Sequence, residues 1–94
     1  MQLKWLFIAR ADRREILAKL ERVNPSAALT TDQHISKQLT RLLQFPQIGR
    51  LTSEQGMREL VINRTPYVAL YRVEQNAIHI LRLLHAAHGP RTPP

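Results

Sequence analysis

The chain has 94 residues, which is enough for one small domain with a single hydrophobic core. It contains no cysteine, and this excludes disulfide bonds, a thiol nucleophile and a zinc site that uses sulfur. Fourteen lysine and arginine residues against seven aspartate and glutamate residues give a formal net charge of +7. A small protein with this charge attracts polyanions such as nucleic acid, an anionic surface or an acidic protein segment.

The apolar stretches are short. The longest purely apolar run, residues 5–9, falls far below the roughly 20 residues that a membrane-spanning helix needs. Charged residues at positions 12–14 interrupt the apolar N-terminal stretch, so we expect no signal peptide. The sequence therefore predicts a cytoplasmic protein.

The first predicted elements are a strand and a helix. Residues 2–8 are rich in bulky apolar side chains and contain neither glycine nor proline, which is typical of a strand. From Asp12 onward the apolar residues recur at helical spacing, so we expect Asp12 to cap a first helix. Asn24 and Pro25 should end this helix, because the residue before a proline avoids the helical region.

A second helix is predicted to follow after a short turn. It should begin at Ser26 or Thr30 and continue to residues 45–46, where its apolar stripe ends at a proline. Two amphipathic helices joined by so short a turn form an antiparallel hairpin. Residues 46–56 contain Pro46 and two glycines and are expected to form a loop.

Three strands are predicted in the second half of the chain, at residues 57–62, 67–73 and 77–85, with turns at 64–66 and 74–76. Connections this short indicate an antiparallel meander. We therefore expect residues 1–88 to form a single domain. Residues 89–94 contain three prolines and should form a flexible tail.

This order of elements predicts an α+β fold, in which the helical hairpin packs on one face of the sheet and leaves the other face open. We expect polar, basic and aromatic side chains of the strands to gather on the open face. Strict alternation divides the last strand into Ile78, Ile80, Arg82 and Leu84 on one side and His79, Leu81, Leu83 and His85 on the other. Neither set is cleanly polar, so alternation alone leaves the solvent-facing side undecided.

The strands carry candidates for the cleavage of a phosphodiester. A metal-independent ribonuclease needs a base, an acid and cations that stabilise the phosphorane. His85 is the candidate acid or base, since imidazole titrates near neutrality. Arg58 and Arg82 are the candidate cations, and Glu59 and Tyr71 are candidate assistants in proton transfer.

Three further arginines are candidates for binding a protein partner or a nucleic acid. Arg50 and Arg64 flank the strands on loops, and Arg72 lies in a strand. Arg72 has a structural alternative, because it could pair with Glu59 or Glu74 across the sheet.

Metal and cofactor binding are not expected. His85 and His88 are three residues apart, but no carboxylate lies nearby in the sequence to complete a ligand set. The chain also contains no glycine-rich phosphate-binding loop.

The second half of the chain resembles toxins of the RelE/ParE superfamily, which belong to bacterial type II toxin–antitoxin modules. The motifs are Gly-x-Arg-Glu-Leu at 56–60, Thr-Pro-Tyr at 65–67, Tyr-Arg-Val at 71–73 and Ile-Leu-Arg-Leu-Leu-His at 80–85. The first half is similar more loosely, at Trp5, Ala9, Asp12, Ile16, the Asn-Pro-x-Ala-Ala turn of 24–28 and Pro46-x-x-Gly-Arg at 46–50. The superfamily fold is the same α+β fold that the pattern of elements predicts.

The resemblance implies one of two targets. RelE-like members cleave mRNA on the ribosome, whereas ParE-like members inhibit DNA gyrase. Arg58 matches a basic position of the nucleases, but the next strand begins Pro66-Tyr67 where many nucleases carry a further basic residue. The ending at 71–85 is more similar to ParE. The resemblance therefore favours inhibition of gyrase, with a ribosome-dependent mRNA endonuclease as the alternative.

The resemblance also implies a partner. Toxins of this superfamily are held inactive in a hetero-oligomeric complex by a cognate antitoxin, whose C-terminal segment wraps around the toxin. The charge of +7 would attract an acidic segment of this kind and accelerate its docking.

Overall fold

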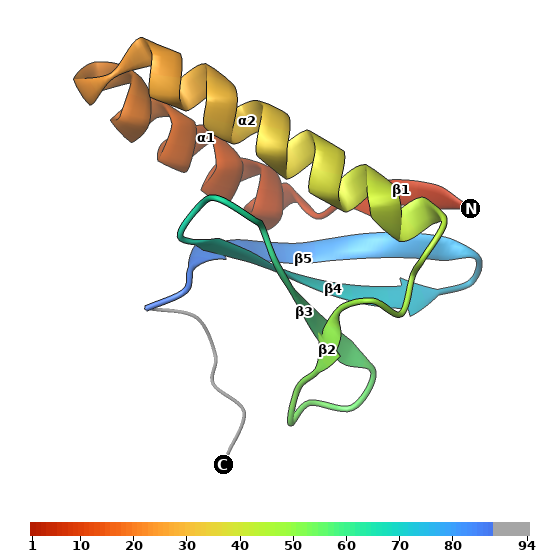
Figure 1. The fold of residues 1–94 in the computed structure, drawn as a ribbon. Helices are drawn as coiled ribbons and strands as arrows, with labels where there is room; N and C mark the ends of the chain where they lie inside the picture. The colour runs from red at the N-terminus through yellow and green to blue at the C-terminus, as the bar shows by residue number, and fades with distance from the viewer. Residues whose placement is uncertain (88–94) are drawn as a thin grey trace.

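The computed structural model describes residues 1–87, which form a helical hairpin above a twisted sheet (Figure 1). The elements are β1 (Gln2–Trp5), α1 (Phe7–Val23), α2 (Pro25–Thr40), the 3-10 turn η1 (Arg41–Leu43), β2 (Arg50–Leu51), β3 (Met57–Val61), β4 (Tyr67–Glu74) and β5 (Ala77–His85). The predicted tail at 89–94 lies outside the described residues.

The strands of the described chain form one mixed sheet in the order β1-β5-β4-β3-β2. β1 runs parallel to β5, and the other neighbours are antiparallel. Both helices pack on one face of this sheet (Figure 1). The predicted α+β architecture is confirmed.

β2 was not predicted. Arg50 pairs with Glu59, and Leu51 pairs with Arg58, within a segment that its proline and glycines indicated as loop. A two-residue strand is too short to show alternation, so only its pairing with β3 reveals it.

The predicted start of the first helix is wrong. Leu6 is extended, and its N–H donates to the carbonyl oxygen of Ile80 at 3.0 Å; the helix begins immediately after it, at Phe7. Ala9 is fully buried on the helix side of the sheet. The bulky apolar residues that indicated a longer strand are helical, because tertiary packing overrides weak local propensity. Asp12 lies inside α1 and does not cap it.

The turn between the helices is close to its prediction. α1 ends at Val23, and the side chain of Asn24 accepts a hydrogen bond from the N–H of Ala27 at 3.2 Å, as an N-terminal cap does. Pro25 occupies the first position of α2, where its missing N–H costs nothing. The second helix therefore begins one residue before the earlier of its two predicted starts.

A β-bulge in β5 changes which side chains face the helices. Tyr71 lies opposite Ile80, whereas the preceding residue Leu70 lies opposite Arg82, so Leu81 is an extra residue without a cross-strand partner. An inserted residue moves every later side chain to the other face. Leu83 therefore joins Ile80 in the core. The two faces predicted for the last strand are wrong beyond Ile80 for this reason.

The core lies between the hairpin and this face of the sheet. Its members include Ala9, Ile35, Leu39, Leu42, Leu60, Ile62, Ala69, Tyr71, Ile78, Ile80 and Leu83. Tyr71 is fully buried among them, and Tyr67 packs against the same cluster. The expectation that aromatic side chains gather on the open face is therefore wrong.

Candidate functional site

Tyr71 attaches the loop of residues 46–49 to the sheet. Its hydroxyl donates to the carbonyl oxygen of Pro46 at 2.8 Å and accepts from the N–H of Gly49 at 2.9 Å. Burial raises the pKa of the Tyr71 phenol, although the hydrogen bond from Gly49 and the charge of Arg58 act in the opposite direction. The neutral phenol thus has a backbone partner for its proton and a second one for its oxygen. This arrangement makes Tyr71 a support of the 46–49 loop.

Arg58 holds the same loop from the neighbouring strand. It lies directly opposite Tyr71, and its guanidinium donates to the carbonyl oxygens of Gln47 at 3.1 Å and Gly49 at 2.7 Å. A Cβ atom at Gly49 would come within 2.5 Å of the Tyr71 ring, so glycine is required by this close approach. Two of the predicted site residues therefore lie together, and both bind backbone.

Arg82 is paired with a helix. Its guanidinium donates to the Asp12 carboxylate at 2.8 and 3.0 Å, and the Leu83 N–H donates to the same carboxylate at 3.0 Å. The hydrogen bond to Asp12 raises the pKa of Arg82. Asp12 thus satisfies a backbone group just after the bulge at Leu81, and it holds Arg82 beside the edge of β5.

His85 lies at the end of β5. Its ring packs edge-on against the ring of Tyr67, with 5.8 Å between the centroids, and its Nδ1 accepts from the N–H of Ala87 at 3.1 Å. Both rings line a hollow of about 530 Å³ beside α1, to which Ile16 and Lys19 also contribute. His85 is accessible here, but its surroundings are mainly aromatic and aliphatic.

The structure does not bring the predicted acid or base and the two predicted cations to one point. Arg58 lies level with Tyr71 on β4, and His85 lies level with Tyr67. These levels are four residues apart, or about 13 Å at the usual rise of a strand. The bulge places Arg82 on the face away from the helices, and its guanidinium binds Asp12 of α1 beside the edge of β5. The spacing of Arg82 and His85 already placed them on opposite faces, but the distance between Arg58 and His85 along the sheet depends on the register between strands, which the sequence does not reveal.

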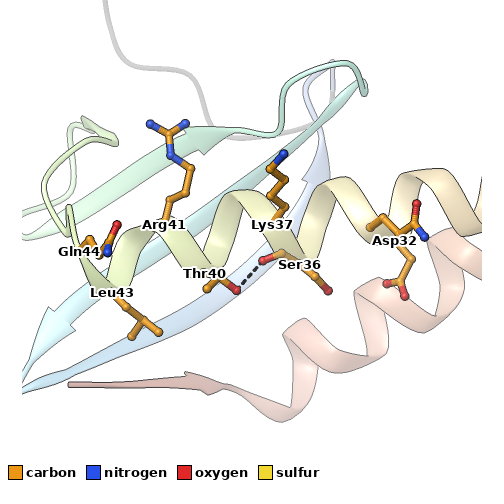
Figure 2. Close-up of a pocket in the computed structure, with 8 residues that line it drawn as sticks. Asp32, Ser36, Lys37, Thr40, Arg41, Leu43 and Gln44 are labelled. Carbon is orange, nitrogen blue, oxygen red and sulfur yellow. Dashed lines mark hydrogen bonds between the residues drawn. The ribbon is translucent and has the colours of Figure 1, made fainter.

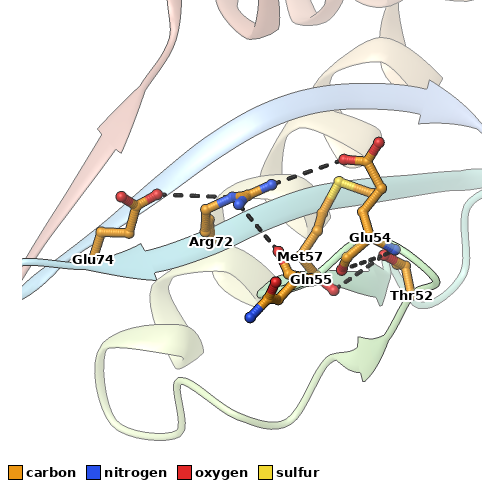
Figure 3. Close-up of polar contacts among 6 residues, drawn as sticks. All are labelled: Thr52, Glu54, Gln55, Met57, Arg72 and Glu74. Atoms are coloured by element: carbon orange, nitrogen blue, oxygen red, sulfur yellow. Dashed lines mark hydrogen bonds and ion pairs between the residues drawn. The ribbon is translucent and has the colours of Figure 1, made fainter.

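The open face of the sheet is partly covered by the loop of residues 52–56, which Arg72 holds (Figure 3). The Arg72 guanidinium donates to the carbonyl oxygen of Gln55 at 3.1 Å and forms ion pairs with Glu54 at 3.9 Å and Glu74 at 3.7 Å. The pairing of Arg72 with Glu74 is one of the two that the sequence allowed. Arg72 therefore stabilises a loop.

Glu59 and Arg50 are paired with each other. The Arg50 guanidinium lies 3.2 Å from a carboxylate oxygen of Glu59, across the pair of β2 and β3. The side chain of Glu59 is only 11% exposed, whereas that of Arg50 is 67% exposed. Arg50 can therefore meet a partner, while Glu59 is largely occupied with Arg50.

Arg64 differs from the other candidates, because no ion pair or hydrogen bond of its side chain occurs within residues 1–87. It is exposed at the turn between β3 and β4, where its backbone is left-handed with φ of 67°. Together with Thr30 and His34 it lines a hollow of about 370 Å³ beside the first half of α2.

Sequence reasoning missed two cations, Lys37 on α2 and Arg41 immediately after it, at the start of η1. Lys37 and Arg41 are exposed and extend from the same side of the helix, where they line a shallow groove of about 780 Å³ (Figure 2). Their separation of four residues was the available signal, since it places two side chains on one face.

Many large apolar side chains are exposed outside the core. Phe7 is 81% exposed and Ile8 is 47% exposed at the start of α1. Others are Val23 at the end of α1, Leu29 on α2, Phe45 and Ile48 in the loop after η1, Leu51 on β2 and Val61 on β3. Apolar surface of this extent is typical of a protein that binds a partner.

The described residues offer no metal site and no membrane span. Within residues 1–87 no three histidine, aspartate or glutamate side chains are close enough to hold a metal ion. None of the described helices has the length and apolar content needed to cross a membrane.

The fold and these surfaces define a small basic α+β protein whose polar groups mostly support loops and whose exposed surface is suited to binding. Residues 3–90 match the family model described as the ParE toxin of the type II toxin–antitoxin system parDE. This match covers most of the chain. The chain belongs to the ParE family of toxins of type II toxin–antitoxin systems, which confirms the resemblance found in the sequence.

Individual relatives agree with this assignment. Toxin RelE2 of Caulobacter vibrioides is 34% identical over 86 residues, which cover 92% of this chain and 96% of the relative. The Y4kP protein of Sinorhizobium fredii is 31% identical over 85 residues, which cover 90% of this chain and 88% of the relative. A solved structure of the chromosomal ParDE system of P. aeruginosa has a TM-score of 0.81 at 33% identity and covers 90% of this chain and 95% of that one.

Proposed function

We propose that this toxin arrests bacterial growth by inhibiting DNA gyrase in the cytoplasm, and that a cognate antitoxin keeps it inactive. The observation that carries the proposal is the dispersal of the candidate nuclease residues. Arg58 binds the backbone of the 46–49 loop, Arg82 binds Asp12, and His85 lies about four residues along the sheet from Arg58.

This dispersal weighs against phosphodiester cleavage for a geometric reason. An acid, a base and a stabilising cation act on one phosphate only when all three lie within hydrogen-bonding reach of it. Arg58 and His85 lie at levels of the sheet about 13 Å apart, and Arg82 leaves β5 on the other face, so the three side chains do not meet that requirement. Inhibition of an enzyme through surface contacts needs no such convergence, and this favours gyrase over mRNA as the target.

The proposed antitoxin has a surface to occupy. The exposed apolar residues Phe7, Ile8 and Leu29 would receive the apolar face of an amphipathic helix. β1 and β2 are the outer strands of the sheet, so each has an edge at which an extended segment of the antitoxin could add a strand. An acidic segment would also match the net charge of +7.

The decisive experiment combines purified toxin, gyrase and plasmid DNA. The toxin would be isolated as the antitoxin complex, separated by denaturant, refolded and added to gyrase with supercoiled plasmid. We expect protein-linked plasmid breaks that require both toxin and gyrase and that disappear when antitoxin is added back. Plasmid with toxin alone is the control.

A parallel experiment in cells separates the two candidate targets. Induction of the toxin should produce DNA breaks, while the bulk of mRNA stays intact. Rapid cleavage of mRNA within translated codons, without DNA damage, would contradict the proposal and support the ribosome-dependent endonuclease.

A further inference from the structure

The acidic groups of this chain are nearly all neutralised by pairing. Six of its seven carboxylates form ion pairs: Asp12, Glu15, Asp32, Glu54, Glu59 and Glu74. The seventh, Glu21, lies on α1. The excess positive charge of the molecule is therefore concentrated wherever cations lack a carboxylate nearby.

The outward face of α2 is one such place. His34, Lys37 and Arg41 lie within about 60° of one another around the helix axis, because they are three, four and seven residues apart. Figure 2 shows the side chains of Lys37 and Arg41 extended on the same side of the helix. The acid of α2, Asp32, is turned toward α1, where it pairs with Arg13.

Arg64 extends this cationic surface past the first half of the helix, where it shares a hollow with Thr30 and His34. We name Arg64, His34, Lys37 and Arg41 the α2 basic stripe. From the level of Thr30 to Arg41 the stripe spans about 16 Å, at 1.5 Å of rise per helical residue. A single DNA strand presents about five phosphates over that distance, at 3.4 Å of rise for each.

The residues beside the stripe favour a phosphate backbone over a polypeptide. Gln33 and Gln44 lie beside Lys37 and Arg41 and supply amide donors, which commonly bind phosphate oxygens. The hydroxyls of Thr30 and Thr40 donate to backbone carbonyls of the helix itself. An amphipathic peptide that binds in a groove is held by apolar anchors, whereas an acidic peptide can be bound by arginine clusters alone. The exposed apolar side chain of α2, Leu29, lies about 80° or more away around the axis from Lys37.

A second group of cations on the molecule makes the contrast clear. Arg10 and Arg14 on α1 are also four residues apart, and their side chains form no ion pair within the described chain. They line a hollow together with Trp5 and Leu17, and the exposed ring of Phe7 begins the same helix. Their mixed apolar surroundings suit a protein partner, whereas the groove beside Lys37 and Arg41 is lined mainly by polar side chains, with Leu43 as the one large apolar residue among the described residues that line it.

We propose that the α2 basic stripe binds the phosphate backbone of double-stranded DNA without reading its sequence. If the target is gyrase, this contact would hold the toxin on the DNA segment that gyrase carries. That last step depends on the proposed function, but the DNA contact itself does not.

The test measures the binding of full-length toxin, freed from antitoxin, to a fluorescent duplex oligonucleotide at several salt concentrations. Binding to DNA displaces counterions, so a plot of log K against log[salt] has a slope of about −0.9 for each phosphate that the protein neutralises. If Lys37, Arg41 and Arg64 each neutralise one phosphate, the expected slope is about −2.7. In the double variant K37Q/R41Q two of these contacts are removed, so the slope should be shallower by about 1.8. The variant R10Q/R14Q removes the same charge from the other helix and should retain the slope.

Several results would overturn the proposal. The first is an equal change in slope for the two double variants, since only the total charge would then matter. The second is competition by single-stranded RNA of the same length that is as effective as competition by duplex DNA. The third is an aspartate-rich peptide that binds more tightly than the duplex and requires Lys37 and Arg41. Circular dichroism of each variant confirms that the fold is retained.

The gyrase assay separates this inference from the proposed function. Toxin that binds duplex DNA through the stripe but produces no gyrase-dependent breaks would support the stripe and contradict the gyrase target. Full gyrase inhibition by K37Q/R41Q, with DNA binding lost, would overturn the role of the stripe in gyrase inhibition.

Discussion

Tyr71 illustrates how one hydroxyl group can organise a loop and make stability depend on pH. Because burial raises its pKa above the ordinary value of about 10, the folded state holds the phenolic proton more tightly than the unfolded state does. This contribution to the free energy of unfolding is complete below pH of about 10. It is lost as the pH rises from there through the folded-state pKa.

We therefore predict that Tyr71→Phe removes this part of the alkaline loss of stability. The variant should also be less stable at neutral pH by about 1–3 kcal/mol, because the Pro46 carbonyl and the Gly49 N–H lose their partner. Urea unfolding at a series of pH values measures both effects. Tyr67→Phe is the control and should retain the wild-type decline above pH 10. The same alkaline decline in Tyr71→Phe would contradict the assignment.

His85 separates the two candidate functions at a single position. Its ring contacts Tyr67 and accepts a backbone hydrogen bond. The proposed inhibition of gyrase through surface contacts does not use His85 as an acid or base, whereas the ribosome-dependent endonuclease would. We predict that His85→Ala leaves growth arrest within about threefold of wild type. Colony counts after induction measure this, with equal toxin levels verified by immunoblot. Complete loss of arrest by a folded variant would instead identify His85 as part of the active surface.

The last strand, β5, depends on a contact with the first helix for its geometry. The Asp12 carboxylate binds both Arg82 and the Leu83 N–H immediately after the bulge. The Asp12 side chain is only 14% exposed, so loss of these charge-assisted bonds should cost about 1.5–3 kcal/mol. We predict that Asp12→Ala lowers the urea midpoint accordingly.

The matched control for this change is Glu15→Ala on the same helix. Glu15 pairs with Lys19 at 3.2 Å, and both side chains are more than 60% exposed. Such an exposed pair contributes about 0.3–0.5 kcal/mol. If the two variants lose the same stability, the bulge does not depend on Asp12.

The whole molecule carries its charge unevenly, and this affects how fast an acidic partner reaches it. With a net charge of +7, the toxin should attract the proposed antitoxin segment over a distance comparable to the Debye length, about 10 Å at 0.1 M salt. We predict that the association rate constant falls at least tenfold between low and high salt, while the dissociation rate constant changes much less. Stopped-flow mixing of toxin and antitoxin measures both. An association rate that does not depend on salt would contradict electrostatic steering.

The molecule can be divided into parts that short stretches of sequence encode and parts that distant contacts create. The existence of the helical hairpin, its turn at Asn24 and Pro25, and the bounds of β5 follow from local periodicity and turn chemistry. The predictions of the turn and of the bounds of β5 were correct or one residue away, whereas the outer ends of the hairpin were predicted wrongly, because α1 begins at Phe7 and α2 ends at Thr40. The motifs of residues 56–85 also sufficed to indicate the superfamily, which the family match at 3–90 confirms.

Three features required the folded chain, and all three depend on contacts between residues far apart in the sequence. The start of α1 follows from the hydrogen bond between Leu6 and Ile80, and β2 exists only through its pairing with β3. The bulge at Leu81 appears in no local pattern, since it is a mismatch between two strands, and Asp12 binds next to it from 70 positions away. Because an inserted residue reverses the faces of everything after it, that mismatch moves Leu83 and His85 to the helix side of the sheet and Arg82 to the other side, which is the reverse of what strict alternation from Ile80 predicts. Composition and periodicity describe each strand alone, and so they could identify the candidate side chains without determining which of them meet.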